Sequence, residues 1–284
     1  MLLHYDCSRL TGEADMMYGW SHAGGGLRDR RRGESRRGKR NDGREINHMR
    51  MRRKKGLIVA FDMEDVDSAL SLAREMRNAE GEFVIKIGRP LEMQAGVKIM
   101  AKIKEISGLP VIYDGKIADI PYISRRIAEN AFDAGADAVI VHAFVGSDVL
   151  RAVKETGKGD VIAVVDMTHE GSNEFLRRVS SEMISAVLDV GVDGVVIPAT
   201  DPQRLRYFAS MIDEAYIISP GIKTQGASVG DAILNGADYE IVGRAIYAAE
   251  NPKEAAETIY EEMIRRWRSG RNGRIGYRWI TGGD

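Results

Sequence analysis

Cysteine is almost absent from this sequence of 284 residues, which contains only Cys7 and five histidines. One cysteine cannot form an internal disulfide, and it excludes a metal site built from several thiolates. No apolar run approaches the roughly 18 residues that a membrane-spanning helix requires. The beginning of the chain also lacks the continuous apolar core of a secretory signal. These absences favour a reducing compartment, and we expect a cytoplasmic protein without a membrane partner.

Net charge is nearly absent as well, at −1, but the charged residues are unevenly distributed. Residues 1–55 carry 15 Lys/Arg and 7 Asp/Glu, a net of +8, so the remainder has a net charge of −9. The first segment has three consecutive arginines at 30–32 and almost no periodic apolar residues. Such a composition cannot bury enough surface to offset chain entropy, so we predict a disordered basic extension over residues 1–55.

Three interpretations of this extension remain open. The first is an upstream, wrongly assigned start codon, with true initiation at Met49 or Met51. The second is an arm that contacts nucleic acid, and the third is a targeting segment. The break in composition at Lys55-Gly56 favours the first, so no nucleic-acid partner is expected.

From Gly56 onward, short apolar runs alternate with amphipathic helical patterns. The runs occupy residues 57–61, 83–87, 111–113, 138–141, 161–165, 194–197, 216–218 and 239–242. Helical patterns between them include 66–77, 96–106, 123–134 and 175–190. This alternation is typical of a parallel sheet covered by helices.

Eight such repeats in about 210 residues match the count and size of a (β/α)8 or TIM barrel. We therefore predict the α/β class, with one barrel domain over residues 56–268 and a flexible tail over 269–284. A doubly wound open sheet is the alternative, but no Gly-x-Gly-x-x-Gly follows the first predicted strand.

A barrel of this class places its active site at the carboxyl ends of its strands. Polar residues follow the eight predicted strands in order: Asp62; Lys86 and Gly88; Asp114 and Lys116; His142; Asp166-Met167-Thr168-His169; Pro198; Ser219-Pro220-Gly221-Ile222; and Gly243-Arg244. Taken singly, Asp62 or Asp166 can simply cap the next helix. All eight strand ends together indicate a functional site.

The third strand end carries the densest group of charges, in the sequence Asp114-Gly115-Lys116-Ile117-Ala118-Asp119-Ile120-Pro121. Side chains at i and i+2 share a face of a strand, so Asp114 and Lys116 point the same way. Ionisable groups this close shift each other's pKa and can perform proton chemistry. The alternative for the motif alone is a solvated ion-pair loop.

The last two strand ends indicate a phosphate site, which barrels of this class commonly place there. The loop over residues 221–228 is rich in glycine and amide donors and contains Gln225. After the eighth strand, Gly243 lets the backbone approach an oxyanion and Arg244 can bind it in a bidentate manner. The pair predicts a phosphorylated substrate.

These motifs resemble the orotidine 5′-monophosphate decarboxylase family, most closely its archaeal branch. The resemblance covers about residues 56–265 and includes the Asp114-x-Lys116-x-x-Asp119-Ile120-Pro121 element, Ser219-Pro220-Gly221 with Gln225-Gly226, and Val242-Gly243-Arg244. A sister family, the metal-dependent aldolase 3-hexulose-6-phosphate synthase, shares the Asp-x-Lys-x-x-Asp element. Ile120-Pro121 and the Gln225 loop favour the decarboxylase.

The resemblance implies a carboxy-lyase that converts orotidine 5′-monophosphate to uridine 5′-monophosphate, the last step of de novo pyrimidine nucleotide synthesis, without metal or cofactor. Lys116 would protonate C6, Asp114 would lie against the departing carboxylate, and Lys86 would complete the charged array. Asp119 would act in the partner's site of a homodimer. The substrate-binding residues would be Asp62 and Lys86 at the ribose, Thr168 at the pyrimidine, and Pro220, Gln225, Gly243 and Arg244 near or at the phosphate.

Two residues depart from the family pattern. Gly115 stands where the family has a bulky apolar residue, and Ile123 stands where it commonly has threonine. A glycine in a strand costs conformational entropy and can loosen the placement of Lys116. We therefore expect an altered rate or affinity rather than a different reaction.

Overall fold

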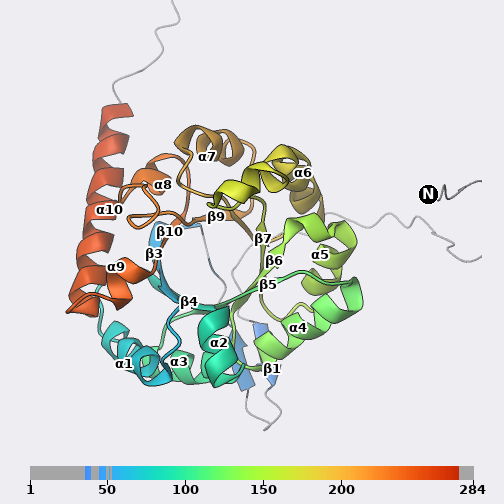
Figure 1. The fold of residues 1–284 in the computed structure, drawn as a ribbon, viewed down its shortest axis with the longest axis horizontal. Helices are drawn as coiled ribbons and strands as arrows, with labels where there is room; N and C mark the ends of the chain where they lie inside the picture. The colour runs from blue at the N-terminus through green and yellow to red at the C-terminus, as the bar shows by residue number, and fades with distance from the viewer. Residues whose placement is uncertain (1–35, 40–44, 49–50, 52, 275–284) are drawn as a thin grey trace, which may run out of the picture. The chain divides into compact units, whose positions relative to one another are not determined.

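The computed structural model describes residues 36–39, 45–48, 51 and 53–274. Eight parallel strands form a closed barrel in the order β10-β3-β4-β5-β6-β7-β8-β9, and helices surround it (Figure 1). The strands are β3 (Gly56–Phe61), β4 (Phe83–Gly88), β5 (Val111–Ile117), β6 (Ala138–His142), β7 (Asp160–Val164), β8 (Gly194–Val196), β9 (Tyr216–Ser219) and β10 (Tyr239–Val242). The predicted (β/α)8 barrel is confirmed.

The helices follow the strands along the chain. They are α1 (Val66–Met76), α2 (Arg89–Ala95), α3 (Ile99–Ser107), α4 (Pro121–Asp133), α5 (Ser147–Lys154), α6 (Ser180–Val190), α7 (Pro202–Ala209), α8 (Asp231–Leu234), α9 (Arg244–Tyr247) and α10 (Pro252–Arg274). Single 3₁₀ turns are η1 (Ala143–Val145), η2 (Glu170–Asn173) and η3 (Leu176–Arg178). No helix in the described part of the chain is both long and apolar enough to cross a membrane.

Local chemistry explains where several helices begin. Asp65 caps α1 by accepting a hydrogen bond from the Ser68 N–H, and Pro121 starts α4 with the fixed φ that suits a first helical residue. The helix expected over 175–190 is split, because Ser180 directs its hydroxyl to the carbonyls of Leu176 and Val165. The chain therefore turns through η3 before α6 begins at Ser180.

Alternate residues of each strand separate the core into two layers. In β3, Leu57, Val59 and Phe61 pack outward against the helices, whereas Ile58 faces the barrel interior. The interior cluster also includes Val84 of β4 and Ile112 of β5, the residues that precede the charged ends of those strands by two positions.

The amino-terminal end of the barrel is closed by Met51, Tyr216 and Tyr239, which belong to the interior cluster. The Met51 backbone N–H donates to Asp160 Oδ2 at 3.0 Å, and the Tyr216 hydroxyl donates to the same oxygen at 3.3 Å. Met51 thus packs with the barrel although it lies within the predicted extension.

Both segments that the sequence predicts to be disordered or flexible contain some regular secondary structure. Within the predicted extension, β1 (Arg36–Lys39) pairs antiparallel with β2 (Glu45–His48), while residues 1–35, including Cys7, lie outside the described residues. At the other end, α10 continues to Arg274, into the segment predicted as a flexible tail. Residues 275–284 of that tail also lie outside the described residues.

Candidate active site

The strand alternation places two ionisable side chains inside the barrel at its carboxyl end. Lys86 follows the inward-facing Val84 by two residues, and Asp114 follows Ile112 in the same way. Both side chains are about 7% exposed. Above the apolar side chains of the barrel interior, Lys86 and Asp114 therefore form a buried ion pair, with Lys86 Nζ 2.9 Å from Asp114 Oδ2.

Lys116 reaches the same place through an irregularity in β5. The pairing of β5 with β6 shifts register between Tyr113 and Ile117, and Lys116 itself adopts a left-handed conformation with φ of +44°. Its Nζ donates to both oxygens of Asp114, at 2.8 and 2.9 Å. A non-glycine residue in this conformation indicates backbone strain at a functional position.

Asp62, from the loop after β3, completes a continuous array of alternating charge. Its Oδ1 accepts from Lys86 Nζ at 3.0 Å, so the order is Asp62, Lys86, Asp114 and Lys116. The two inner members are buried, while Lys116 is 40% exposed at the edge of the cavity. The solvated ion-pair loop is therefore not what this segment forms.

Burial and neighbouring charges act in opposite directions on the inner pair. Burial alone would raise the pKa of Asp114, but the Lys86 and Lys116 ammonium groups overcome it and hold that pKa at about 2. Burial would likewise lower the pKa of Lys86, but Asp114 and Asp62 reverse the effect and raise it above its ordinary value. The inner pair therefore stays ionised throughout the physiological pH range.

A cavity of about 370 Å³ opens over this array at the carboxyl ends of the strands. Nine of the ten predicted site residues line it: Asp62, Lys86, Asp114, Lys116, Thr168, Pro220, Gln225, Gly243 and Arg244. The rest of the wall is largely apolar and was not singled out from the sequence: it includes Ala60, Ile140, Val164, Val196, Ile241 and Tyr247. Except for Tyr247, which lies in α9, only their position in the predicted strands could have identified them.

Two further segments of the cavity lining carry side chains suited to binding an anion. The loop after β9 closes on itself, because Ala227 donates its N–H to the Gly221 carbonyl and Lys223 donates to the Ala227 carbonyl. It leaves Gln225 exposed. Arg244, at the start of α9, is also exposed, and no carboxylate among the described residues forms an ion pair with it. A guanidinium in this state is available to bind an anion.

Asp119 is the predicted site residue that does not line the cavity. It is exposed, and its Oδ1 accepts from the adjacent Ile120 N–H at 2.7 Å. The residue that caps α4 is Ile120, without a side-chain hydrogen bond, so Asp119 does not cap this helix in the usual way. Within one chain, the array therefore begins with Asp62 and does not include Asp119.

The capping alternative also fails for Asp62 and Asp166, the other aspartates at strand ends. Asp65 caps α1 instead of Asp62. The carboxylate of Asp166 is buried and receives Arg204 Nε at 3.0 Å, with Arg177 Nε at 3.4 Å. Sequence reasoning missed both arginines, because they come from η3 and α7, distant from Asp166 in sequence.

The remaining strand ends contribute less. His142 ends β6 beside Phe144, with ring centroids 4.7 Å apart, and its buried Nδ1 has no hydrogen-bond partner in the described structure. Burial and the Lys116 charge lower the pKa of this imidazole. Pro198 and Gly88 do not line the cavity. Across the described residues, no group of three or more His, Cys, Asp or Glu is placed to hold a metal ion.

A (β/α)8 barrel with a buried array of alternating charges beneath a cavity at the carboxyl ends of its strands is typical of an enzyme. The orotidine 5′-phosphate decarboxylase / HUMPS family model matches residues 55–259. The chain therefore belongs to that family.

Individual relatives agree with this assignment. The orotidine 5′-phosphate decarboxylase of Thermococcus kodakarensis is 44% identical over 209 residues, which cover 73% of this chain and 96% of the relative. The crystal structure of the Pyrococcus horikoshii decarboxylase has a TM-score of 0.69 and 41% identity, covering 73% of this chain and 99% of that one. The Methanocaldococcus jannaschii decarboxylase, solved with the inhibitor BMP, has the same TM-score at 36% identity, covering 74% and 98%.

Proposed function

We propose that the protein decarboxylates orotidine 5′-monophosphate to uridine 5′-monophosphate in pyrimidine nucleotide synthesis. The observation that carries the proposal is the contact of the Lys116 ammonium with both oxygens of Asp114 at the edge of the cavity. This contact fixes a proton donor beside a permanently ionised carboxylate. The family and the decarboxylases among its members support the same reaction.

The chemistry requires a group of this kind. When the C6–carboxylate bond breaks, carbon dioxide leaves and its bonding electron pair remains on C6, which has no adjacent electron sink. The Lys116 ammonium stabilises the developing negative charge and then transfers its proton to C6, which yields uridine 5′-monophosphate. Asp114, which is itself paired with Lys86, holds the ammonium in place, and no cofactor takes part in the proposed step.

The substrate lies in the cavity between the charged array and the segments that carry Gln225 and Arg244. Asp62 and Lys86 bind the ribose hydroxyls, and Thr168 contacts the pyrimidine edge. Gln225, Gly243 and Arg244 bind the 5′-phosphate, with Pro220 beside them. Binding energy from the phosphate, which does not react, can be used to order the reacting end of the substrate.

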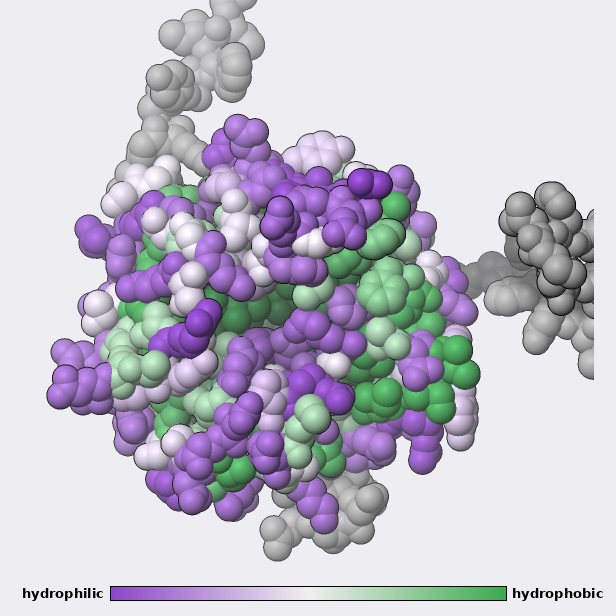
Figure 2. All heavy atoms as spheres, in the orientation of Figure 1, coloured by the Kyte–Doolittle hydropathy of each residue, from purple (hydrophilic) through white to green (hydrophobic). Residues whose placement is uncertain are grey.

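We propose further that the enzyme is a homodimer in which Asp119 enters the partner's site. Asp119 is exposed and outside its own cavity, and it is followed by Ile120 and Tyr122, which are 63% and 68% exposed. Phe144 of η1 is also 55% exposed. Figure 2 shows apolar side chains gathered over α4 and α5, whereas hydrophilic ones surround the centre of the barrel. Exposed apolar surface of this kind marks an interaction site.

The proposal extends to the organisation of the chain. The barrel and α10 form the catalytic domain, and the basic extension takes no part in the reaction. The family model begins at residue 55, which supports this division. A cytoplasmic location fits the single cysteine and remains part of the proposal.

The decisive experiment follows the absorbance of orotidine 5′-monophosphate after addition of purified protein in the presence of EDTA. Loss of substrate absorbance with release of carbon dioxide is expected. A protein that leaves this substrate intact but cleaves a ketose phosphate when magnesium is supplied would instead be the aldolase of the sister family.

A further inference from the structure

The ring of Tyr113 covers the outer face of the segment that carries Asp114 and Lys116. Tyr113 and Gly115 lie on the helix-facing side of β5, and a Cβ built at position 115 would lie 2.5 Å from Tyr113 Cζ. The φ of Gly115 is not in the left-handed region, so a side chain there would meet the ring of Tyr113 rather than strain the backbone. The ring of Tyr113 thus occupies the space beside position 115, where the family pattern has a bulky residue.

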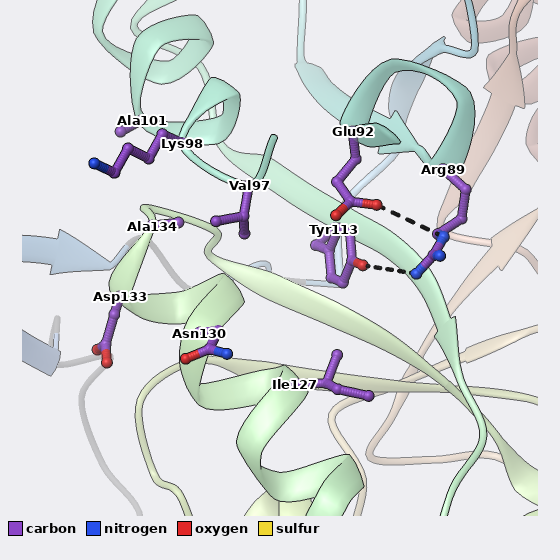
Figure 3. Close-up of a pocket in the computed structure, with 10 residues that line it drawn as sticks. All are labelled: Arg89, Glu92, Val97, Lys98, Ala101, Tyr113, Ile127, Asn130, Asp133 and Ala134. Atoms are coloured by element: carbon purple, nitrogen blue, oxygen red, sulfur yellow. Dashed lines mark hydrogen bonds and ion pairs between the residues drawn. The ribbon is translucent and has the colours of Figure 1, made fainter. Parts of the chain in front are cut away.

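The hydroxyl of Tyr113 is contacted by Arg89 of α2, which in turn is paired with Glu92. Arg89 Nη1 donates to the Tyr113 hydroxyl at 3.4 Å, and Arg89 Nε lies 3.6 Å from Glu92 Oε2 (Figure 3). The ring borders a depression of about 610 Å³ between α2, α3 and α4. The ring therefore lies between Gly115 and this depression, and the Arg89 contact is at its hydroxyl end.

Lys116 needs such support, because its left-handed conformation is strained. A non-glycine residue in this region is strained and persists only where its surroundings fix it. Asp114 fixes the side chain of Lys116 from inside the barrel. The Tyr113 ring lies against Gly115 on the outer face of β5, within the stretch where the pairing with β6 is irregular.

We infer that Tyr113 is a positioning residue for Lys116, acting through the backbone at Gly115. The inference rests on the proposed function, since the role of Lys116 as proton donor is part of it. It concerns a ring that never touches the substrate cavity. Consequently, disturbing the ring should lower kcat while leaving nucleotide binding intact.

The chain offers a matched pair of glycines for the test. At the start of β8, a Cβ at Gly194 would lie 2.8 Å from Cδ2 of the Tyr216 ring, at the opposite end of the barrel. Gly115→Ala and Gly194→Ala therefore each press one methyl group against a tyrosine. Gly115→Ala should lower kcat about 100-fold with KM within about threefold of wild type, because small misplacements of a reacting group have effects of this size. Gly194→Ala should lower the Tm and leave kcat unchanged.

An exchange variant separates positioning from simple loss of packing. Tyr113→Ala/Gly115→Phe returns a ring to the outer face of β5 and should recover at least about tenfold in kcat over Gly115→Phe alone. Tyr113→Phe, which keeps the ring and loses only the hydroxyl, should stay within about tenfold of wild type. Equal kcat losses in the Gly115 and Gly194 variants, or no recovery in the exchange variant, would overturn the inference.

A crystal structure of Gly115→Ala provides a readout that does not depend on turnover. Lys116 should leave the left-handed region, or its Nζ should move from Asp114 by about 1 Å. An unchanged Lys116 overturns the inference. A wild-type protein that fails to consume orotidine 5′-monophosphate overturns the proposed function instead, and the two failures are thereby distinguished.

Discussion

Lys116 combines a strained backbone with two hydrogen bonds from a single ammonium group to Asp114. Its partner Asp114 also pairs with Lys86, so the buried carboxylate keeps one cation when Lys116 is removed. Lys116 can therefore be removed without leaving an isolated buried charge, which would be strongly destabilising.

We expect Lys116→Ala to lose at least 100-fold in kcat while it folds and binds uridine 5′-monophosphate with an affinity close to wild type. The physical reason is that two lysines contact Asp114, but Lys86 is buried and also paired with Asp62, so only Lys116 presents its ammonium group at the cavity edge. Steady-state kinetics and calorimetric titration measure the two quantities. Lys102→Ala on the exposed side of α3 is the control, and retention of more than about 1% of wild-type kcat, roughly 2.7 kcal/mol of barrier, contradicts the assignment.

Arg244→Ala should weaken substrate binding by about 1.5–3 kcal/mol, the range for hydrogen bonds to a charged group. The effect should appear mainly in KM, with a smaller effect on kcat if the phosphate also orders the site. Arg77→Ala, at the exposed end of α1, is the matched control. An Arg244→Ala protein that binds nucleotide monophosphate as tightly as wild type would place the phosphate elsewhere.

Sequence reasoning succeeded at the residue scale where strand alternation alone decides the outcome. Lys86 and Asp114 follow apolar interior residues by two positions, so their inward direction follows from the period of a strand. The bonds of Arg204 and Arg177 to Asp166 depend on how separate loops fold back, and no local pattern encodes them. The strained φ of Lys116 also arises from an irregularity that the motif does not reveal.

At the scale of elements, Glu240 of β10 fixes the beginning of α8. Its carboxylate is fully buried and accepts the backbone N–H groups of Gly230, Ala232 and Ile233 at 2.9, 3.0 and 3.3 Å. Burial raises its pKa to about 7, although these three N–H groups act in the opposite direction. The loop that carries Gln225 is thereby joined to the last strand of the barrel.

This pKa predicts how stability depends on pH. The folded-state pKa lies above the ordinary value of 4.5, so its stabilising contribution is complete below pH 4.5 and lost as pH rises through 7. The unfolding free energy should fall over that window by on the order of 3 kcal/mol, at about 1.4 kcal/mol per pKa unit. Urea unfolding of wild type and Glu240→Gln measures it.

The Glu240→Gln variant should lack this dependence, and Glu254→Gln on the exposed start of α10 should retain it. Parallel curves for wild type and Glu240→Gln between pH 4.5 and 7.5 would contradict the assignment. Asp114 acts in a separate window: its pKa lies below its ordinary value of 3.8, so its contribution is lost only as pH falls toward 2.

Element boundaries were predictable to the extent that periodicity sets them. The runs predicted for the first, second and last strands differ from β3, β4 and β10 by no more than one residue at an end. The third run ended at residue 113, whereas β5 continues to Ile117, because Asp114, Gly115 and Lys116 interrupt the apolar pattern. The added residues of β5 include Asp114 and Lys116, so the apolar pattern fails at the residues that form the candidate site.

At the scale of the whole molecule, the shared site can be tested by mixing variants. Asp119→Ala and Lys116→Ala should each be nearly inactive as homodimers. Random assortment makes half of the dimers mixed, and each mixed dimer carries one intact and one doubly damaged site. Activity should therefore recover to about a quarter of the wild-type value, from the two-fold symmetry of such an interface. A mixture that exchanges subunits and stays inactive would show that Asp119 acts in its own chain.

Removal of residues 1–50 should leave kcat/KM within about twofold of wild type, because the array and the proposed phosphate-binding residues lie within residues 62–244. The shortened chain keeps Met51, whose contacts with Asp160 close the amino-terminal end of the barrel. Removal of residues 1–53, which deletes Met51, is the comparison and should lower the Tm. A large loss of activity in the first variant would assign the extension a role in the function.

The closure of the barrel by β3 and β10 determines when an active enzyme first exists in the cell. β3 pairs on one side with β10, from Gly56 opposite Tyr239 onward, so its hydrogen bonds on that edge wait for the last strand. At about 5–20 residues per second, a ribosome needs on the order of 10–40 seconds to synthesise the chain between them. During that interval Asp62 and Lys86 are synthesised long before Arg244. The nascent barrel therefore has an open edge, and neither its sheet nor its cavity is complete until shortly before synthesis ends.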